Sequence, residues 1–228
     1  MFPLWDEIPT RKIPFITILI IVLNCLVYYY QIFIFTDATT FVYAYGLIPY
    51  EVFQSVDLFP PGPSPIQLTV ISSMFMHGSF VHLFGNMLYL WIFGNNVEDY
   101  LGKFRFIIFY FLSGLLAALG QILINPNSQV PMIGASGAVA GILGAYFILF
   151  PGARITTLIF FGFFIRLIKM PALFVLGLWF IFQLLYGLSD LSLGGGAGVA
   201  WFAHIGGFVG GIILIKLFQP KKRYYFFL

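Results

Sequence analysis

Four polar residues inside otherwise apolar stretches of this chain have side chains suited to hydrolysis: His82, Asn86, Ser136 and His204. His82 and Asn86 are four residues apart, so on a helix they share one face and can donate hydrogen bonds to a common point. Ser136 offers a hydroxyl nucleophile, and His204 is the residue type that most often removes the proton from such a group. The set predicts acyl transfer by a Ser–His dyad, a chemistry that needs neither a metal nor a cofactor.

The glycines around Ser136 suit a nucleophile at the start of a helix. Gly134 and Gly137 permit a tight turn and leave the backbone beside the hydroxyl uncovered. Free N–H groups and the positive end of the helix dipole would then face a developing oxyanion. Taken alone, helix capping and close packing explain this segment better, because the spacing of Gly137, Gly141 and Ala145 is a common packing pattern in membranes.

Two further residues bear on the dyad. No carboxylate lies inside an apolar run to orient His204, so we expect packing to orient it. His77 precedes His82 by five residues and should point off its helix face, so we interpret it as an interfacial or loop-stabilising residue.

The composition places the whole chain in a membrane. Of its 228 residues, 61% are hydrophobic and only 8% are charged, whereas a soluble domain carries about 25% charged residues. The single cysteine, Cys25, lies in an apolar run and is interpreted as a packing residue, so neither a disulfide framework nor a cysteine metal site is available.

Six apolar runs are long enough to cross roughly 30 Å of hydrocarbon. We predict an all-α polytopic membrane protein, a single domain over residues 1–228 built as a six-helix bundle. A further apolar stretch, Ile155 to Ile168, is interrupted by Arg166 and is expected to lie along the interface. The predicted spans cover about residues 13–35, 80–97, 104–124, 134–150, 171–191 and 199–217.

The basic residues predict the orientation, because Lys and Arg collect on the cytoplasmic side of membrane proteins. With six spans and a cytoplasmic N-terminus, all eleven fall on inner segments, and both termini are predicted to be cytoplasmic. The net charge of +3 then reflects orientation, and no nucleic-acid partner is expected. These residues are Arg11, Lys12, Lys103, Arg105, Arg154, Arg166, Lys169, Lys216, Lys221, Lys222 and Arg223.

Two outer loops are distinctive. The first, Thr36 to Ser79, is long and apolar, with Phe41, Leu47, Ile48 and Phe53 among its residues, and we expect it to lie half-sunk in the outer leaflet. The last, Gly194 to Gly198, is nearly all glycine and suits either a movable cap or a plain connector.

The four polar residues are expected to lie at a similar depth in the membrane. Counted from the inner end of each span at 1.5 Å per residue, they lie roughly 18–24 Å above the inner face, in one layer. The fourth helix, from Ser136, is too short to cross alone, so the outer chain must dip inward. Irregular backbone at that depth must be buried in protein or line a water-filled cavity, and a serine hydrolase would need the cavity.

At this point the sequence resembles the rhomboid family of intramembrane serine proteases, in its prokaryotic six-span form. The stretch from His77 to Asn86 resembles the family's histidine-asparagine motif, Gly134 to Gly137 its nucleophile motif, and Ala203 to Gly207 its base motif. One departure is Leu68-Thr69, where many members have a Trp-Arg pair. The internal hydrogen bonding of the first outer loop is therefore expected to differ from that of those members.

The resemblance implies roles, partners and a location. Ser136 would attack, His204 would accept its proton, and His82, Asn86 and the Ser136 backbone N–H would stabilise the oxyanion. The partners would be single-span transmembrane protein substrates and membrane lipids, and the location a prokaryotic inner membrane.

Functions of other classes make different demands. A transporter usually shows repeats or buried charges, and the charges here lie near span ends. A non-catalytic membrane chaperone or scaffold would need neither Ser136 nor His204. A metalloprotease would need a Glu beside its histidines, and an aspartyl protease two buried Asp residues, whereas Asp37 and Asp190 lie at span ends.

Overall fold

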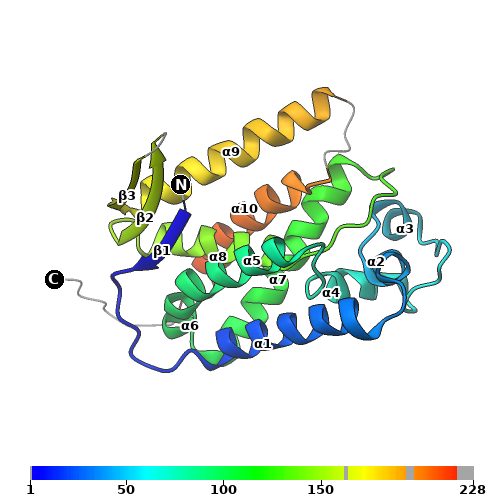
Figure 1. Cartoon of the computed structure of the whole chain (residues 1–228), viewed down its shortest axis with the longest axis horizontal. Helices are drawn as coiled ribbons and strands as arrows, with labels where there is room; N and C mark the ends of the chain where they lie inside the picture. The colour runs from blue at the N-terminus through cyan, green and yellow to red at the C-terminus, as the bar shows by residue number, and fades with distance from the viewer. Residues whose placement is uncertain (1, 162–163, 194–197, 220–228) are drawn as a thin grey trace.

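The structure is a computed structural model that describes residues 2–161, 164–193 and 198–219. The long helices lie side by side, with a small sheet at one end of the molecule and several short helices at the other (Figure 1). The long helical segments, in chain order, are α1 (Phe15–Tyr29) with the π-helical turn η1 (Tyr30–Ile34), the uninterrupted series α5 (Phe80–Tyr89), η3 (Leu90–Gly94) and α6 (Asn95–Leu101), then α7 (Lys103–Ile124), α8 (Ser136–Leu149), α9 (Ala172–Ser192) and α10 (Trp201–Leu217).

Three of these segments are long and apolar enough to cross a membrane: Phe15–Ile34, Lys103–Ile124 and Ala172–Ser192. The helices α8 and α10 are apolar but shorter. With 14 residues, α8 is about 21 Å long at 1.5 Å per residue.

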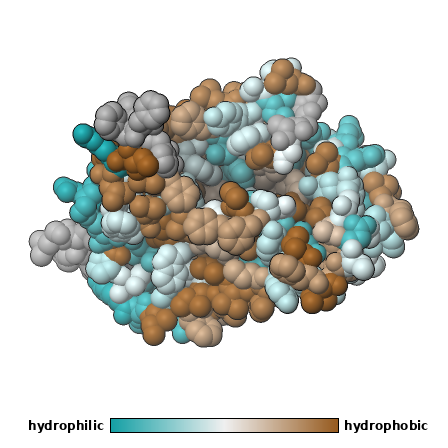
Figure 2. Space-filling view, in the orientation of Figure 1, coloured by the Kyte–Doolittle hydropathy of each residue, from teal (hydrophilic) through white to brown (hydrophobic). Residues whose placement is uncertain are grey.

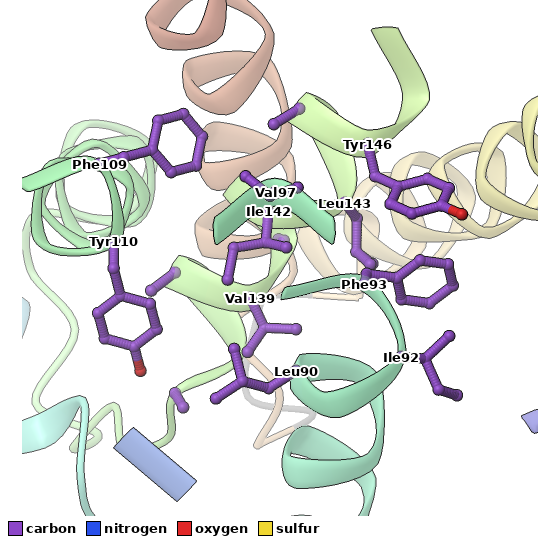
Figure 3. Packing of buried hydrophobic residues seen from close by; sticks show 14 of the residues in the cluster. Leu90, Ile92, Phe93, Val97, Phe109, Tyr110, Val139, Ile142, Leu143 and Tyr146 are labelled. Atoms are coloured by element: carbon purple, nitrogen blue, oxygen red, sulfur yellow. The ribbon is translucent and has the colours of Figure 1, made fainter. Parts of the chain in front are cut away.

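The helix α8 forms the centre of the core. Every residue from Ala138 to Tyr146 is buried, as expected for a helix that is apolar on all sides. Leu90 and Phe93 of η3 and Tyr110 of α7 pack around Ile142 and its neighbours (Figure 3). Ser136 is therefore the first residue of the most enclosed helix in the molecule.

The outer surface of α1 is apolar. Leu19, Val22 and Leu26 are exposed, and Figure 2 shows apolar surface along this helix. Cys25 is also exposed, so its interpretation as a packing residue is wrong. Exposed side chains of this kind are those that a span presents to lipid.

Close packing joins α10 to α8. A Cβ atom at Gly207 would overlap the carbonyl oxygen of Gly137, and one at Gly211 would overlap that of Gly141. The glycines of these two helices therefore face each other, which allows the two backbones to touch.

A three-stranded antiparallel sheet lies where α8 ends and α9 begins, and sequence analysis did not anticipate it. It consists of β1 (Phe2–Asp6), β2 (Arg154–Phe161) and β3 (Phe164–Pro171), in that order. The stretch from Ile155 to Ile168 therefore forms paired strands, consistent with its many β-branched and aromatic residues. The chain is otherwise mostly helical, as predicted.

Glu98 connects the end of α6 to the start of α1. Its carboxylate accepts hydrogen bonds from the backbone N–H of Ile16 at 3.0 Å and of Thr17 at 2.8 Å, and from the Thr17 hydroxyl at 2.8 Å. These bonds satisfy free N–H groups at a helix N-terminus. Glu98 therefore has a structural role, because it caps the N-terminus of α1 from α6.

The first long loop folds into α2 (Ala38–Tyr45), α3 (Pro49–Gln54), the 3₁₀ turn η2 (Ile66–Leu68) and α4 (Thr69–Ser73). Phe41, Leu47 and Ile48 are buried in the protein, whereas Phe53 is exposed. Most of these apolar side chains therefore pack inside the protein, and the position of the loop in the outer leaflet stays a prediction. At the Leu68-Thr69 departure, the buried Thr69 hydroxyl donates to the Ile66 carbonyl at 2.7 Å, so the loop retains local hydrogen bonding.

Candidate active site

Ser136 and His204 are in direct contact. The Nε2 atom of His204 lies 2.8 Å from the Oγ atom of Ser136, although the two residues are 68 positions apart. The contact follows from the close packing of α8 on α10, because Gly137 directly follows Ser136 and Gly207 lies one helical turn after His204. A distance of 2.8 Å is within the range required for proton transfer.

The other ring nitrogen of His204 is also bonded. Nδ1 lies 2.8 Å from the Oε1 atom of Gln183, which belongs to α9. Two tryptophan rings flank the imidazole: the ring centroid of Trp179 is 6.1 Å away, and that of Trp201 is 6.3 Å away. Packing around His204 was predicted, but the hydrogen bond to the Gln183 amide oxygen was not.

His82 and Asn86 lie next to the backbone that leads into Ser136. A Cβ atom at Gly134 would come within 2.8 Å of the His82 ring and 3.5 Å of the Asn86 Nδ2 atom. Gly134 has a φ of +128°, which a residue with a side chain rarely adopts. Its N–H donates to the Ser73 carbonyl at 2.8 Å. Glycine here thus provides both the turn and the close approach.

His77 is placed differently from the sequence prediction. Its ring is fully buried, lies 5.0 Å from the His82 ring, and brings Nε2 to 3.0 Å from the Nδ2 atom of Asn86. The backbone of His77 is held in turn by the Gln31 side chain, which donates to its carbonyl at 3.0 Å. The expectation that His77 points away from the face of His82 is wrong, because His77 precedes α5 and does not follow its helical spacing.

A cavity of about 680 Å³ joins these groups. Ser136, His204, His82 and Asn86 all line it, and the segment 128–133 forms part of the wall. The volume holds several water molecules, each of which occupies about 30 Å³ in the liquid. The structure therefore brings all four predicted residues to one cavity, where a hydroxyl, an amide and two imidazoles face the same space.

Sequence analysis missed Gln183 and placed His77 wrongly. Gln183 was an amide inside an otherwise apolar run, which is a signal in itself because polar groups in a span are costly. His77 was noticed, but linear spacing could not show that the chain turns before α5.

Comparison with known proteins identifies the family. The family model of the rhomboid domain matches residues 67–221, which is more than half of the chain. The chain belongs to the rhomboid family. The match includes Gln183 and the four predicted residues that line the cavity. Together with the apolar helices, it shows that the chain is an integral membrane protein.

Several curated rhomboid relatives are similar to this chain. Rhomboid protein 1, mitochondrial, of Saccharomyces cerevisiae is 30% identical over 153 residues, covering 64% of this chain and 40% of the relative. RHOMBOID-like protein 5 of Arabidopsis thaliana is 32% identical over 157 residues, or 68% and 46%. The putative rhomboid protease YdcA of Bacillus subtilis is 35% identical over 77 residues, or 34% and 38%. The chain thus spans less than half the length of each of these relatives.

Proposed function

We propose that this rhomboid-family chain is an intramembrane serine endopeptidase that cleaves single-span transmembrane proteins within or near the membrane. Ser136 is the nucleophile and His204 the general base. His82, Asn86 and the backbone N–H of Ser136 stabilise the oxyanion. The names of two Bacillus subtilis relatives, the putative rhomboid protease YdcA and the rhomboid protease GluP, support a protease.

The observation that carries this proposal is the 2.8 Å contact between the Ser136 hydroxyl and the His204 ring at the wall of a polar cavity. A serine that only capped a helix would not require a histidine from another helix. The contact has the nucleophile–base geometry of serine hydrolases, which recurs on unrelated folds.

The reaction follows from these positions. As the Ser136 oxygen bonds to the scissile carbonyl carbon, its proton moves to Nε2 of His204, and the carbonyl oxygen becomes an oxyanion. The side chains of Asn86 and His82 lie beside the backbone of Gly134, two residues before Ser136. From there they donate hydrogen bonds to the oxyanion. The carbon–nitrogen bond then breaks, and the leaving amine takes the proton from His204. Water from the cavity hydrolyses the acyl-enzyme with His204 again as base.

The orientation belongs to the same proposal. Six spans with both termini in the cytoplasm of a prokaryotic cell place the sheet at the inner face and the cavity toward the outer face. Basic residues support this arrangement, because Arg154 lies in β2, Lys169 lies in β3 and Lys216 lies in the last turn of α10. The Gly194 to Gly198 loop, predicted to face outward, lies outside the described residues except for Gly198.

Cysteine labelling tests the orientation. In a variant without Cys25, Val130→Cys replaces an exposed residue and should be labelled from outside. Labelling only from the cytoplasm would overturn the orientation.

A serine-reactive fluorophosphonate probe and a panel of labelled single-span substrates test the activity. We expect the wild type to take the probe and to cleave at least one substrate, and Ser136→Ala and His204→Ala to do neither while remaining folded and inserted. Ser113→Ala is the matched control, since Ser113 is a buried serine on the neighbouring helix α7. Probe labelling of Ser136→Ala, or near wild-type cleavage by either dyad variant, would exclude the dyad. A wild type that neither takes the probe nor cleaves any substrate would favour a non-catalytic scaffold.

A further inference from the structure

The imidazole of His204 is held from both sides by residues of two other helices. Ser136 of α8 lies at Nε2 and Gln183 of α9 lies at Nδ1, each at 2.8 Å. Gln183 is 7% exposed, so its side chain is enclosed together with the ring that it contacts. In the second half of α9, the only buried residues are Gln183 and Gly187.

The contact at Nδ1 determines which ring nitrogen carries the proton. A neutral imidazole has one N–H donor and one acceptor nitrogen. The amide oxygen of Gln183 can only accept, so Nδ1 carries the hydrogen and Nε2 keeps its lone pair for the Ser136 proton. The opposite tautomer would place the hydrogen on Nε2 and leave the ring unable to act as a base.

We propose that Gln183 is a positioning residue for the general base: it fixes the Nδ1–H tautomer and the ring orientation of His204. This inference rests on the proposed function and extends it. Gln183 orients His204 in place of the carboxylate that the apolar runs do not contain. The two flanking tryptophans limit the tilt of the ring by packing, but the indole N–H can only donate and cannot hold the Nδ1–H tautomer.

An amide suits this position better than a carboxylate would. A buried carboxylate costs several kilocalories per mole in desolvation unless it is fully paired. The Gln183 amide provides the hydrogen-bond acceptor that a carboxylate would provide, but it carries no charge. His204 is therefore oriented without burying a negative charge in the apolar bundle. The expected consequence is a base that is correctly oriented but whose protonated form is stabilised less than it would be by a carboxylate.

Two substitutions separate this role from simple packing. Gln183→Met keeps the size of the side chain and removes the acceptor, whereas Gln183→Glu keeps an acceptor and adds a charge. We expect Gln183→Met to lower kcat by about 10- to 100-fold with little change in KM, a part of the 10²–10⁴ that a general base contributes. Gln183→Glu should recover most of that loss and should move the acidic limb of the pH–rate profile upward by about one unit, because a nearby carboxylate favours the imidazolium. Phe182→Leu, an exposed neighbour on α9, is the control and should behave as wild type.

The rate of fluorophosphonate labelling gives a readout that is independent of the substrate. Wild type that labels and cleaves, beside Gln183→Met with rates within twofold of wild type, would overturn the role of Gln183 alone. That role would also be overturned if Gln183→Glu were no better than Gln183→Met and left the pH profile in place. Wild type in which Ser136 takes no label would instead overturn the proposed function, and the role of Gln183 with it. Melting temperatures of the detergent-solubilised variants close to wild type would show that losses are not due to unfolding.

Discussion

Gly207 of α10 packs against the carbonyl oxygen of Gly137 in α8, so closely that a Cβ atom at Gly207 would overlap that oxygen. This contact lies one residue after Ser136 and three residues after His204. The distance between nucleophile and base is therefore set by the helix packing as much as by the side chains. The glycines at the interface are part of the catalytic geometry that we propose.

Replacing Gly207 with Ala should separate the two helices and disturb the dyad. Overpacking of a tight interface typically costs about 1–3 kcal/mol, and a shift of about 1 Å can lower a rate about 10²-fold. We expect a lower melting temperature in detergent and a fall in probe labelling of about 10- to 100-fold. Gly177→Ala is the control, because a Cβ there would make ordinary contact, 3.7 Å from Phe147. Equal labelling of both variants would show that this contact does not set the site.

Asn86→Ala should give a slow but measurable enzyme. The Asn86 amide faces the backbone at Gly134, near the expected oxyanion, and loss of one such donor typically costs about 10²–10³ in kcat. The measurement is cleavage under single-turnover conditions, with substrate binding assayed separately. A loss confined to KM would assign Asn86 to substrate binding.

His77→Ala should act through Asn86 and should slow cleavage less than His82→Ala does. His77 lies 3.0 Å from the Asn86 amide nitrogen and is not among the residues that line the cavity. The double variant with Asn86→Ala should therefore be hardly slower than Asn86→Ala alone, because residues that share one interaction are not additive. Fully multiplicative losses, or a larger effect for His77 than for His82, would contradict this arrangement.

Much of this site could be predicted from the sequence because its proposed chemistry depends on polar residues, which are rare inside apolar spans. Polar groups are costly in an apolar span, so Ser136, His204, His82 and Asn86 stood out. Gln183 shows the limit: its role depends on which way α9 faces, and a helix that is apolar on most sides gives no such information.

The sheet shows a second limit of the sequence. The β1 strand pairs with β2 across about 150 positions, and a short apolar run does not reveal a distant partner. The charge-interrupted stretch could therefore be assigned to an interface, but its strands could not be recognised without the packing of the N-terminus.

The N-terminal strand should respond to pH through Asp6. The Asp6 carboxylate accepts hydrogen bonds of 2.6 Å from the Tyr146 hydroxyl and from the Asn96 amide, at the end of the core opposite Ser136 in α8. Burial raises the pKa of Asp6 to about 6 from 3.8, outweighing the Tyr146 hydrogen bond, which lowers it. The folded protein thus holds this proton more tightly than the unfolded chain, so stability falls as the pH rises from about 4 through 6.

Asp6→Asn should remove that pH dependence. Between pH 5 and 7 we expect the melting temperature of the wild type to fall relative to that of Asp6→Asn, which keeps an acceptor for Tyr146 but does not ionise. Glu7→Gln is the control: the hydrogen bond and ion pair with Lys169 lower the pKa of the exposed Glu7 below 4.5, so it does not titrate in this window. A constant difference between wild type and Asp6→Asn across the window would contradict the role of Asp6.

Substrate choice should depend on how easily the outer end of a transmembrane helix unwinds. In a helix the scissile carbonyl is hydrogen-bonded within the chain, so Ser136 can reach it only after local unwinding. In lipid the freed backbone groups cost several kilocalories per mole each, unless a wet polar cavity receives them. In this protein Ser136 lines a cavity together with His82, Asn86 and other polar residues. A Gly inside a helix costs about 1 kcal/mol relative to Ala, and a Pro about 3, which should speed cleavage by roughly one to two orders of magnitude if unwinding limits the rate. The measurement compares matched single-span substrates whose outer segments contain Leu-Ala or Gly-Pro, with the same pair placed at the inner end as a control. Equal cleavage of the two outer-end substrates would show that unwinding is not the selective step.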